Sequence, residues 1–218
     1  MSVGPLIIVS GPAGSGKSTL IGMALREFGP RLRHSVSATT RERRKGEVDG
    51  VHYHFWTRQR FEAGIKAGEF LEYATVFGED YYGTPRSEVE PYRNQGIAVI
   101  LDIDVQGARQ FKAVYPESVL IFLLPPSAEA LMKRLNSRQT ESGDAFRTRV
   151  RAAREELRAA VSYQYAVVND DLESAYRIVS SIVDAEAVRH ARQPHLTARV
   201  NALVEELDRH LVQLSTPA

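Results

Sequence analysis

The residues best suited to chemistry lie at positions 11–18, GPAGSGKS, which match the pattern G-x-x-x-x-G-K-[ST] of a phosphate-binding loop. Its glycines let backbone N–H groups converge on phosphate oxygens, and a helix that begins near Lys17 adds its positive end. Lys17 would contact the β- and γ-phosphates of a nucleoside triphosphate, and the Ser18 hydroxyl would ligate Mg²⁺. The loop predicts a triphosphate site but leaves the reaction open.

A second chemically dense stretch is SVSATTRERRKGEVDGVHYHF, residues 35–55, with four cations and three carboxylates within positions 41–49. Arg41 and Arg44 lie three residues apart, with Tyr53 nearby. Guanidinium forks and phenolic hydroxyls suit a dianionic phosphate, and a kinase must hold its second substrate in line with the first. We therefore interpret the stretch as half of an acceptor site, with Arg43 and Lys45 expected in solvent.

Residues 104–107, DVQG, are compatible with the D-x-x-G switch of a regulatory GTPase. Such proteins also carry an Asn-Lys-x-Asp motif that reads guanine. The asparagines at 94, 136, 169 and 201 are each followed by a residue other than lysine. The sequence thus disfavours a regulatory GTPase.

The elements that must position these residues are four short apolar runs at 6–10, 97–104, 119–124 and 165–169. Each is rich in Val, Ile and Leu without alternation, which is typical of strands buried on both faces of a parallel sheet. Helical stretches lie between them. We predict an α/β fold of the P-loop NTPase type, a parallel sheet flanked by helices, with core segments 1–34, 91–133 and 156–190.

Three segments depart from this rhythm. Residues 35–90 are predicted to form an inserted, strand-bearing subdomain, and the arginine-rich residues 134–155 a lid. After RQP, which breaks a helix, residues 191–218 predict a helical extension with a seam of apolar side chains three or four apart. The seam comprises Leu196, Val200, Leu203, Leu207, Leu211 and Leu214. We expect it to pack on its own domain, with a homodimer contact as the alternative.

Composition sets outer limits on function. The 218 residues are 43% hydrophobic and 25% charged, with 28 Lys and Arg against 27 Asp and Glu. A net charge of +1 gives no global field for nucleic acid or an anionic membrane. The chain has no cysteine, which excludes thiolate chemistry and disulfides. We expect a cytoplasmic protein, monomeric or homodimeric, without a membrane segment.

Six stretches together resemble the guanylate kinase family, which converts ATP and GMP to ADP and GDP. They are GPAGSGKST, SVSATTRERRKGEVDGVHY, EFLEYATVFGEDYYGT, ILDIDVQGA, LPPSAEALMKRLNSR and VVNDDL, all in the family's order. The resemblance covers residues 4 to about 188 and implies the partners ATP and GMP with Mg²⁺.

The resemblance also assigns an acceptor site. It implies that the GMP phosphate is held by Arg41, Arg44, Tyr53 and Tyr82, and the guanine by Ser37, Glu72, Thr84 and Asp102. One carboxylate such as Glu72 can accept both N1–H and the N2 amino group of guanine, whereas adenine offers no such donor pair. Glu47 is expected to pair with one of the clamp arginines.

On the donor side the resemblance implies contacts to ATP from the loop and the helix that follows it. These residues are Gly11, Pro12, Ala13, Gly14, Ser15, Gly16, Lys17, Ser18 and Thr19. Lys17 and Arg41, with the lid residues Arg134, Arg138 and Arg149, would act on the transferring group. Of the arginines on the helix around 146–161, Arg149 stands apart, while Arg147, Arg151, Arg154 and Arg158 form a stripe expected in solvent.

The remaining assignments concern loop ends. Asn169 is expected to contact adenine, and Asp170, spaced three from Glu173, to cap the next helix. Asp102 and Asp104 would project to one side of their strand, with Asp104 near Mg²⁺ through water and loop capping as its alternative.

Two rival functions remain open on the sequence. One is a non-catalytic guanylate-kinase-like binding module of scaffold proteins, in which P-loop residues are typically lost, whereas Lys17 and Ser18 are present here. The other is a P-loop kinase with a different acceptor, for which Ser37 and Glu72 discriminate. One departure from the family pattern is Gln139, which stands where a glycine is usual in the lid.

Overall fold

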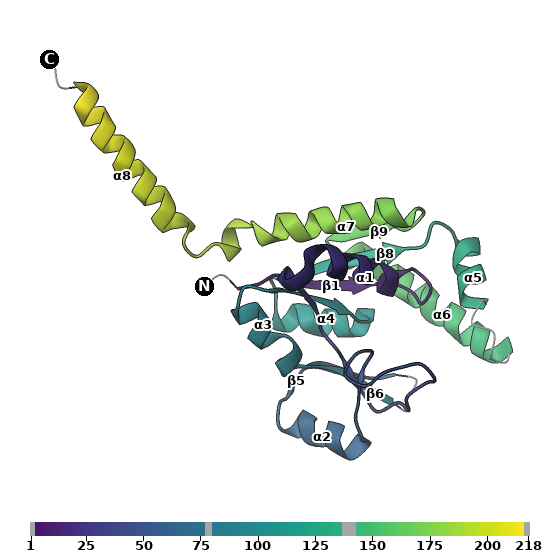
Figure 1. Ribbon diagram of the computed structural model, residues 1–218. Helices are drawn as coiled ribbons and strands as arrows, with labels where there is room; N and C mark the ends of the chain where they lie inside the picture. Colours follow the sequence, from purple (N-terminus) through teal and green to yellow (C-terminus); the bar gives the residue numbers. More distant parts are fainter. Residues whose placement is uncertain (1–2, 77–79, 137–142, 216–218) are drawn as a thin grey trace.

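The central element is a five-stranded parallel sheet (Figure 1). The computed structural model describes residues 3–76, 80–136 and 143–215. In spatial order the strands are β2 (Leu32–His34), β7 (Ala98–Asp102), β1 (Leu6–Ser10), β8 (Val119–Leu124) and β9 (Tyr165–Val168). All four strands predicted from apolar runs are present, but burial on both faces is wrong for β9, an edge strand in which only Val167 is buried. The bounds of β1 and β8 are the same as those of the apolar runs at 6–10 and 119–124. The strand expected at 97–104 ends earlier, at Asp102.

Helices cover both faces of this sheet. On one face lie α1 (Lys17–Phe28) and α7 (Leu172–Ala187), and on the other α3 (Glu90–Asn94) and α4 (Val105–Val114). Each face of the sheet has a hydrophobic core, and alternate residues of β1 pack into them. Ile7 and Val9 pack on the α1 side, and Leu6 and Ile8 pack on the other side. Both faces of β1 are therefore buried, which explains why its sequence does not alternate.

The strand order places the phosphate loop opposite the end of β7. β1 lies between β7 and β8, and both pairings are parallel. Val9 is in register with Asp102, so the residues after β1 and those after β7 leave the same edge. In open α/β sheets this carboxyl edge is where ligands bind.

A second sheet lies inside the segment expected as an insertion. Its order is β4 (His54–Phe55), β3 (Ala38–Thr39), β6 (Asp80–Pro85) and β5 (Phe70–Val76), with α2 (Arg58–Lys66) against it. A small aromatic core holds it together: Phe61 and Phe70 stack with centroids 4.3 Å apart. This sheet therefore has a hydrophobic core of its own, and it lies below the main sheet in Figure 1.

Helices α5 (Ala128–Asn136) and α6 (Gly143–Ala159) form the lid side. An apolar stripe of α6 packs on α5: Phe146, Val150 and Leu157 lie against Leu131 and Leu135. Val161 follows the end of the helix and is 93% exposed. Short 3₁₀ turns complete the chain at Gly29–Arg31, Arg86–Glu88, Ala160–Ser162 and His190–Arg192.

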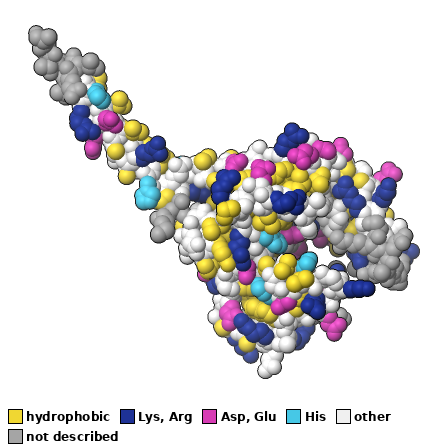
Figure 2. Space-filling model, viewed as in Figure 1, with side chains coloured by type: hydrophobic (Ala, Val, Ile, Leu, Met, Phe, Trp, Pro, Cys, Tyr) yellow, Lys and Arg dark blue, Asp and Glu magenta, His cyan; other side chains and the backbone are white. Residues whose placement is uncertain are grey.

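The C-terminal helix α8 (Leu196–Ser215) corrects one expectation. It does not pack back on its domain but projects away from it, and Val200, Leu203 and Leu207 stay exposed (Figure 2). Its base is nevertheless fixed, because buried Arg192 pairs with Glu186 at 3.2 Å. Among the described helices none is apolar enough over a sufficient length to cross a membrane.

Candidate active site

The phosphate loop adopts a conformation that only glycine tolerates. Gly11, Gly14 and Gly16 have φ of 146°, 82° and 101°. A Cβ on Gly11 would also lie 2.4 Å from the carbonyl oxygen of Leu123. Helix α1 begins directly afterwards at Lys17, and no side chain of a described residue caps it. Its first N–H groups are thus available to an anion.

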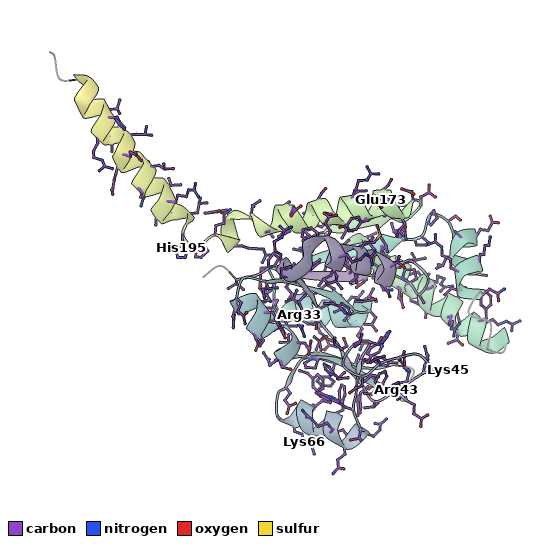
Figure 3. All side chains as sticks on the ribbon, in the orientation of Figure 1. Arg33, Arg43, Lys45, Lys66, Glu173 and His195 are labelled. Carbon is purple, nitrogen blue, oxygen red and sulfur yellow. The ribbon has the colours of Figure 1, made fainter. Side chains whose placement is uncertain are left out.

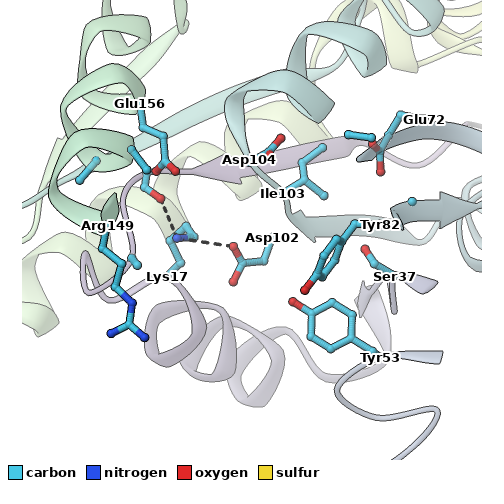
Figure 4. A pocket seen from close by; sticks show the side chains of 16 residues that line it. Lys17, Ser37, Tyr53, Glu72, Tyr82, Asp102, Ile103, Asp104, Arg149 and Glu156 are labelled. Carbon is cyan, nitrogen blue, oxygen red and sulfur yellow. Dashed lines mark hydrogen bonds and ion pairs between the residues drawn. The ribbon is translucent and has the colours of Figure 1, made fainter. Parts of the chain in front are cut away.

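Lys17 and Ser18 share Asp102 as a neighbour. The Lys17 ammonium donates to the carbonyl oxygen of Gly11 at 2.7 Å and lies 3.8 Å from the Asp102 carboxylate (Figure 4). The Ser18 hydroxyl lies 3.4 Å from the other carboxylate oxygen. Asp102 therefore lies beside the phosphate loop.

The residues expected to clamp the acceptor phosphate are assembled around Arg41. Its guanidinium donates to both oxygens of Glu47 at 2.8 and 3.0 Å, and to the Tyr82 hydroxyl at 3.1 Å. The hydrogen bonds from Arg41 lower the pKa of Glu47. The rings of Tyr53 and Tyr82 meet edge to face with centroids 5.8 Å apart. The expected role of Glu47 is confirmed: it braces Arg41.

Arg44 lies on the same loop with a different environment. Its backbone N–H donates to Glu47 at 2.7 Å, while its side chain is exposed. Arg43 and Lys45 are exposed as expected and lie on the outer loop in Figure 3. Of Arg43, Arg44 and Lys45, it is Arg44 whose backbone is held by Glu47, the carboxylate that also bonds Arg41.

The end of the site where base contacts were expected centres on Glu72. This carboxyl group is 6% exposed and accepts a hydrogen bond from the Thr84 hydroxyl at 2.8 Å, across the paired strands β5 and β6. Burial raises the pKa of Glu72 to about 7, and the nearby charge of Asp104 adds to that effect. A buried carboxyl with spare acceptor capacity suits a ligand with adjacent N–H donors.

Asp102 and Asp104 diverge. Because β7 ends at Asp102, Asp104 becomes the N-cap of α4 and accepts from the Gly107 N–H at 2.8 Å. The capping alternative is therefore confirmed for Asp104. This turn lies against Glu72: a Cβ on Gly107 would lie 3.0 Å from the Glu72 carboxylate. The importance of Gly107 was not predicted, although the DVQG motif contained it.

One cavity of about 370 Å³ joins these groups. The second sheet contributes Ser37, Tyr53, Glu72 and Tyr82, and the main sheet edge contributes Lys17, Asp102 and Asp104. Helix α6 supplies the third wall with Arg149 and Glu156. Glu156 was not predicted as a site residue. The sequence feature that could have indicated it is its position two helical turns after Arg149, which places both on the same face of the helix.

The lid arginines are placed unequally. Arg134 donates to the carbonyl oxygen of Gly14 at 3.3 Å, and Arg149 lines the cavity. Arg138, like Gln139, falls outside the described residues. The stripe of Arg147, Arg151, Arg154 and Arg158 is exposed, as expected.

Asn169 supports the phosphate loop. Its side chain is 5% exposed and donates to the carbonyl oxygen of Ser15 at 2.7 Å, while a Cβ on Gly16 would lie 2.3 Å from the same amide nitrogen. That nitrogen is therefore engaged by the loop. The predicted cap at Asp170 is wrong by one residue: Asp171 caps α7 by accepting from the Ser174 N–H at 2.8 Å, since the helix begins at Leu172.

Comparison with known proteins gives a consistent result. The profile of the family described as guanylate kinase matches residues 4–186. The guanylate kinase of Carboxydothermus hydrogenoformans is 46% identical over 192 residues, covering 88% of this chain and 93% of the relative. That of Vibrio cholerae is 46% identical, covering 94% and 100%. The crystal structure of guanylate kinase from Anaplasma phagocytophilum superposes with a TM-score of 0.74 at 32% identity, covering 93% and 96%.

Proposed function

The chain belongs to the guanylate kinase family and is an ATP:GMP phosphotransferase, and we propose that the cavity between its two sheets and α6 is where the transfer occurs. The observation that supports this assignment most strongly is that one cavity is lined both by the phosphate loop and by the tyrosines beside Arg41. Lys17 on the phosphate loop faces the tyrosines of the Arg41 clamp across that space. A kinase needs such an arrangement, because donor and acceptor phosphates must meet in line.

At the donor end the loop residues 11–19 cradle the ATP phosphates. Arg134 and Arg149, with Arg138, supply positive charge from the lid side. Asn169 acts in this proposal mainly by holding the loop, since its amide already bonds Ser15. Contact between Asn169 and adenine remains a prediction, now for the side-chain carbonyl oxygen.

At the acceptor end Arg41, Arg44, Tyr53 and Tyr82 hold the GMP phosphate. Glu72 accepts the N1–H and N2 amino hydrogens of guanine, while Ser37 and Thr84 serve its acceptor atoms. Geometry favours exchanging the roles first given to two aspartates. Asp104 lies beside Glu72 and joins the guanine site, whereas Asp102 lies beside Lys17 and Ser18.

The donor set around Ser18 fits Mg²⁺. A hydroxyl and a carboxylate 3.4 Å apart at the triphosphate end are hard oxygen groups, which Mg²⁺ prefers, and Asp102 could hold a metal-bound water. When bound, Mg²⁺ would neutralise charge on the β- and γ-phosphates.

The chain's own residues then perform positioning and charge neutralisation. Lys17 and the lid arginines oppose the negative charge of the transferring group, and Arg41 fixes the attacking phosphate oxygen. That oxygen is already anionic, so the reaction needs no general base. Closure of α6 over the cavity would exclude water, which would otherwise take the phosphoryl group.

The direct test of function is acceptor choice. ADP formation from ATP should be measured with GMP, dGMP, AMP, UMP and dTMP in parallel. Turnover with GMP far above AMP is expected, because adenine leaves the buried Glu72 carboxylate without its donors. No turnover at all would indicate a binding module, and a preference for AMP would contradict the assigned base site.

Arg44→Ala should weaken the acceptor site selectively. Loss of charge-assisted bonds worth about 1.5–3 kcal/mol should lower kcat/KM for GMP by about 10- to 100-fold. The KM for ATP should barely change, because Arg44 lies on the second sheet's loop. Lys45→Ala, an exposed cation on the same loop, is the matched control and should leave both constants unchanged. A large loss in ATP affinity for Arg44→Ala would contradict the division of labour.

We propose a cytoplasmic enzyme of purine nucleotide metabolism, without nucleic-acid or membrane partners, that is a monomer or a homodimer.

We also propose that the C-terminal helix α8 is dispensable for catalysis. A chain ending at His195 keeps the Arg192–Glu186 pair but lacks α8. It should retain the full chain's kcat and KM within about twofold, since α8 supplies no residue to the cavity. Size-exclusion chromatography of both chains would show whether α8 changes the oligomeric state; a large activity loss would contradict this proposal.

A further inference from the structure

Glu156 is a carboxyl group in the cleft with no role assigned so far. It lies on α6 two turns after Arg149, and Ala152 and Ala153 between them form the same wall. Figure 4 shows its carboxyl oxygens directed into the cleft on the side of Lys17 and Asp104. It also borders a second hollow between α4 and α6.

Its hydrogen-bonding capacity is unused by the protein. No hydrogen bond or ion pair from the described part of the chain reaches the Glu156 carboxyl group. Burial raises its pKa to about 7, with Lys17 opposing and Asp104 and Asp102 adding to the shift. Glu155, the preceding residue, is instead exposed and accepts from Arg154 and Arg158. Because no described residue bonds it, this half-buried carboxyl group of Glu156 can accept a hydrogen bond from a ligand in the cleft.

The position of Glu156 indicates which part of a ligand it meets. The two ends of the acceptor are accounted for, the phosphate by the Arg41 clamp and the base by Glu72 with Thr84. On this binding mode the sugar lies between these two ends, inside the cavity that α6 also lines. Along that middle section of a nucleotide the hydrogen-bond donors are ribose hydroxyls, whereas phosphate oxygens would be repelled by a carboxylate.

On the acceptor-binding mode proposed above, we propose that Glu156 accepts a hydrogen bond from the ribose 2′-hydroxyl of GMP and thereby distinguishes ribonucleotide from deoxyribonucleotide acceptors. Being on α6, Glu156 also makes this contact depend on closure of the lid side. The sugar would then help to hold α6, and with it Arg149, over the reacting phosphates.

The test pairs a protein variant with a substrate variant. kcat/KM is measured for GMP and dGMP with wild type and Glu156→Ala at saturating ATP and Mg²⁺. Wild type should prefer GMP by about tenfold or more, as expected for one charge-assisted hydrogen bond. Glu156→Ala should lose that factor for GMP and almost nothing for dGMP, so the two efficiencies converge.

Controls separate this contact from a general effect on α6. Glu155→Ala, one residue away, should keep the wild-type GMP to dGMP ratio. Glu156→Gln keeps the shape and one acceptor oxygen, so it should lose less than alanine for GMP and nothing for dGMP. An equal loss for both acceptors, or a wild type without a GMP preference, would overturn the proposal. Absence of ADP formation with either acceptor in wild type would instead reject the proposed function.

Discussion

Lys17→Met should lower kcat by about 100- to 1,000-fold, the effect of removing one preorganised charge from a transition state. The lysine is held at the loop by Gly11 and faces Asp102, so it is already positioned where the triphosphate binds. Methionine keeps much of the side-chain volume but carries no charge. The loss should appear in kcat more than in the KM for GMP, since the acceptor clamp lies on the other sheet.

The controls for Lys17→Met are structural and chemical. Thermal unfolding should show a stable fold, and GMP binding by calorimetry should be retained. Lys66→Ala, a remote lysine at the end of α2, should leave kcat unchanged. A Lys17→Met variant with near wild-type kcat would mean that the loop does not act on the transferring group.

Glu72→Gln should lower kcat/KM for GMP by about 100-fold or more, because two charge-assisted bonds to guanine are lost. The amide also presents N–H donors to the donors of the base. Thr84→Val is the companion variant: it removes the hydroxyl that donates to Glu72, and a smaller loss is expected. ATP turnover kinetics at saturating GMP should change much less than kcat/KM in both variants.

The same carboxyl group predicts a pH dependence. Since the pKa of Glu72 in the free enzyme is raised to about 7, kcat/KM for GMP should rise as pH increases through about 7. The ionised form is the one that accepts both guanine donors. Dividing the wild-type profile by the Glu72→Gln profile removes titrations that both share, including that of the GMP phosphate. A flat ratio would contradict the role of Glu72.

Stability should respond in the opposite direction. A carboxyl whose pKa is raised on folding, here from 4.5 to about 7, binds more protons in the folded than in the unfolded chain. Between these pH values the free energy of unfolding of wild type should therefore fall relative to Glu72→Gln as pH rises. Denaturant titrations of both proteins at several pH values would measure it.

Local patterns predicted the fold well because they depend on neighbouring residues. The phosphate loop follows from its glycines, the strands from unbroken apolar runs, and the pairing of Glu47 with one of the clamp arginines from a short loop. The aspartates were harder to assign. The period of a strand puts Asp102 and Asp104 on one side, but the strand ended at Asp102, and a new helix redirected Asp104.

Long-range packing explains the other differences. The partner of Asn169 lies 154 residues away, which no local pattern reveals. The apolar seam of α8 is periodic whether it meets its own domain or not, so periodicity could not predict its exposure. Glu156 looks like any glutamate on an amphipathic helix until α6 is placed against the cleft.

The junction of Glu72 with the turn at Asp104 and Gly107 makes guanine a bridge between two bodies. Glu72 belongs to the second sheet, while Gly107 belongs to a helix of the main sheet. A base that contacts both sides acts as a removable crosslink, and its binding energy goes into bringing the two sheets together. A wrong base should therefore lower kcat as well as raise KM, because unlinked sheets leave the phosphates out of line.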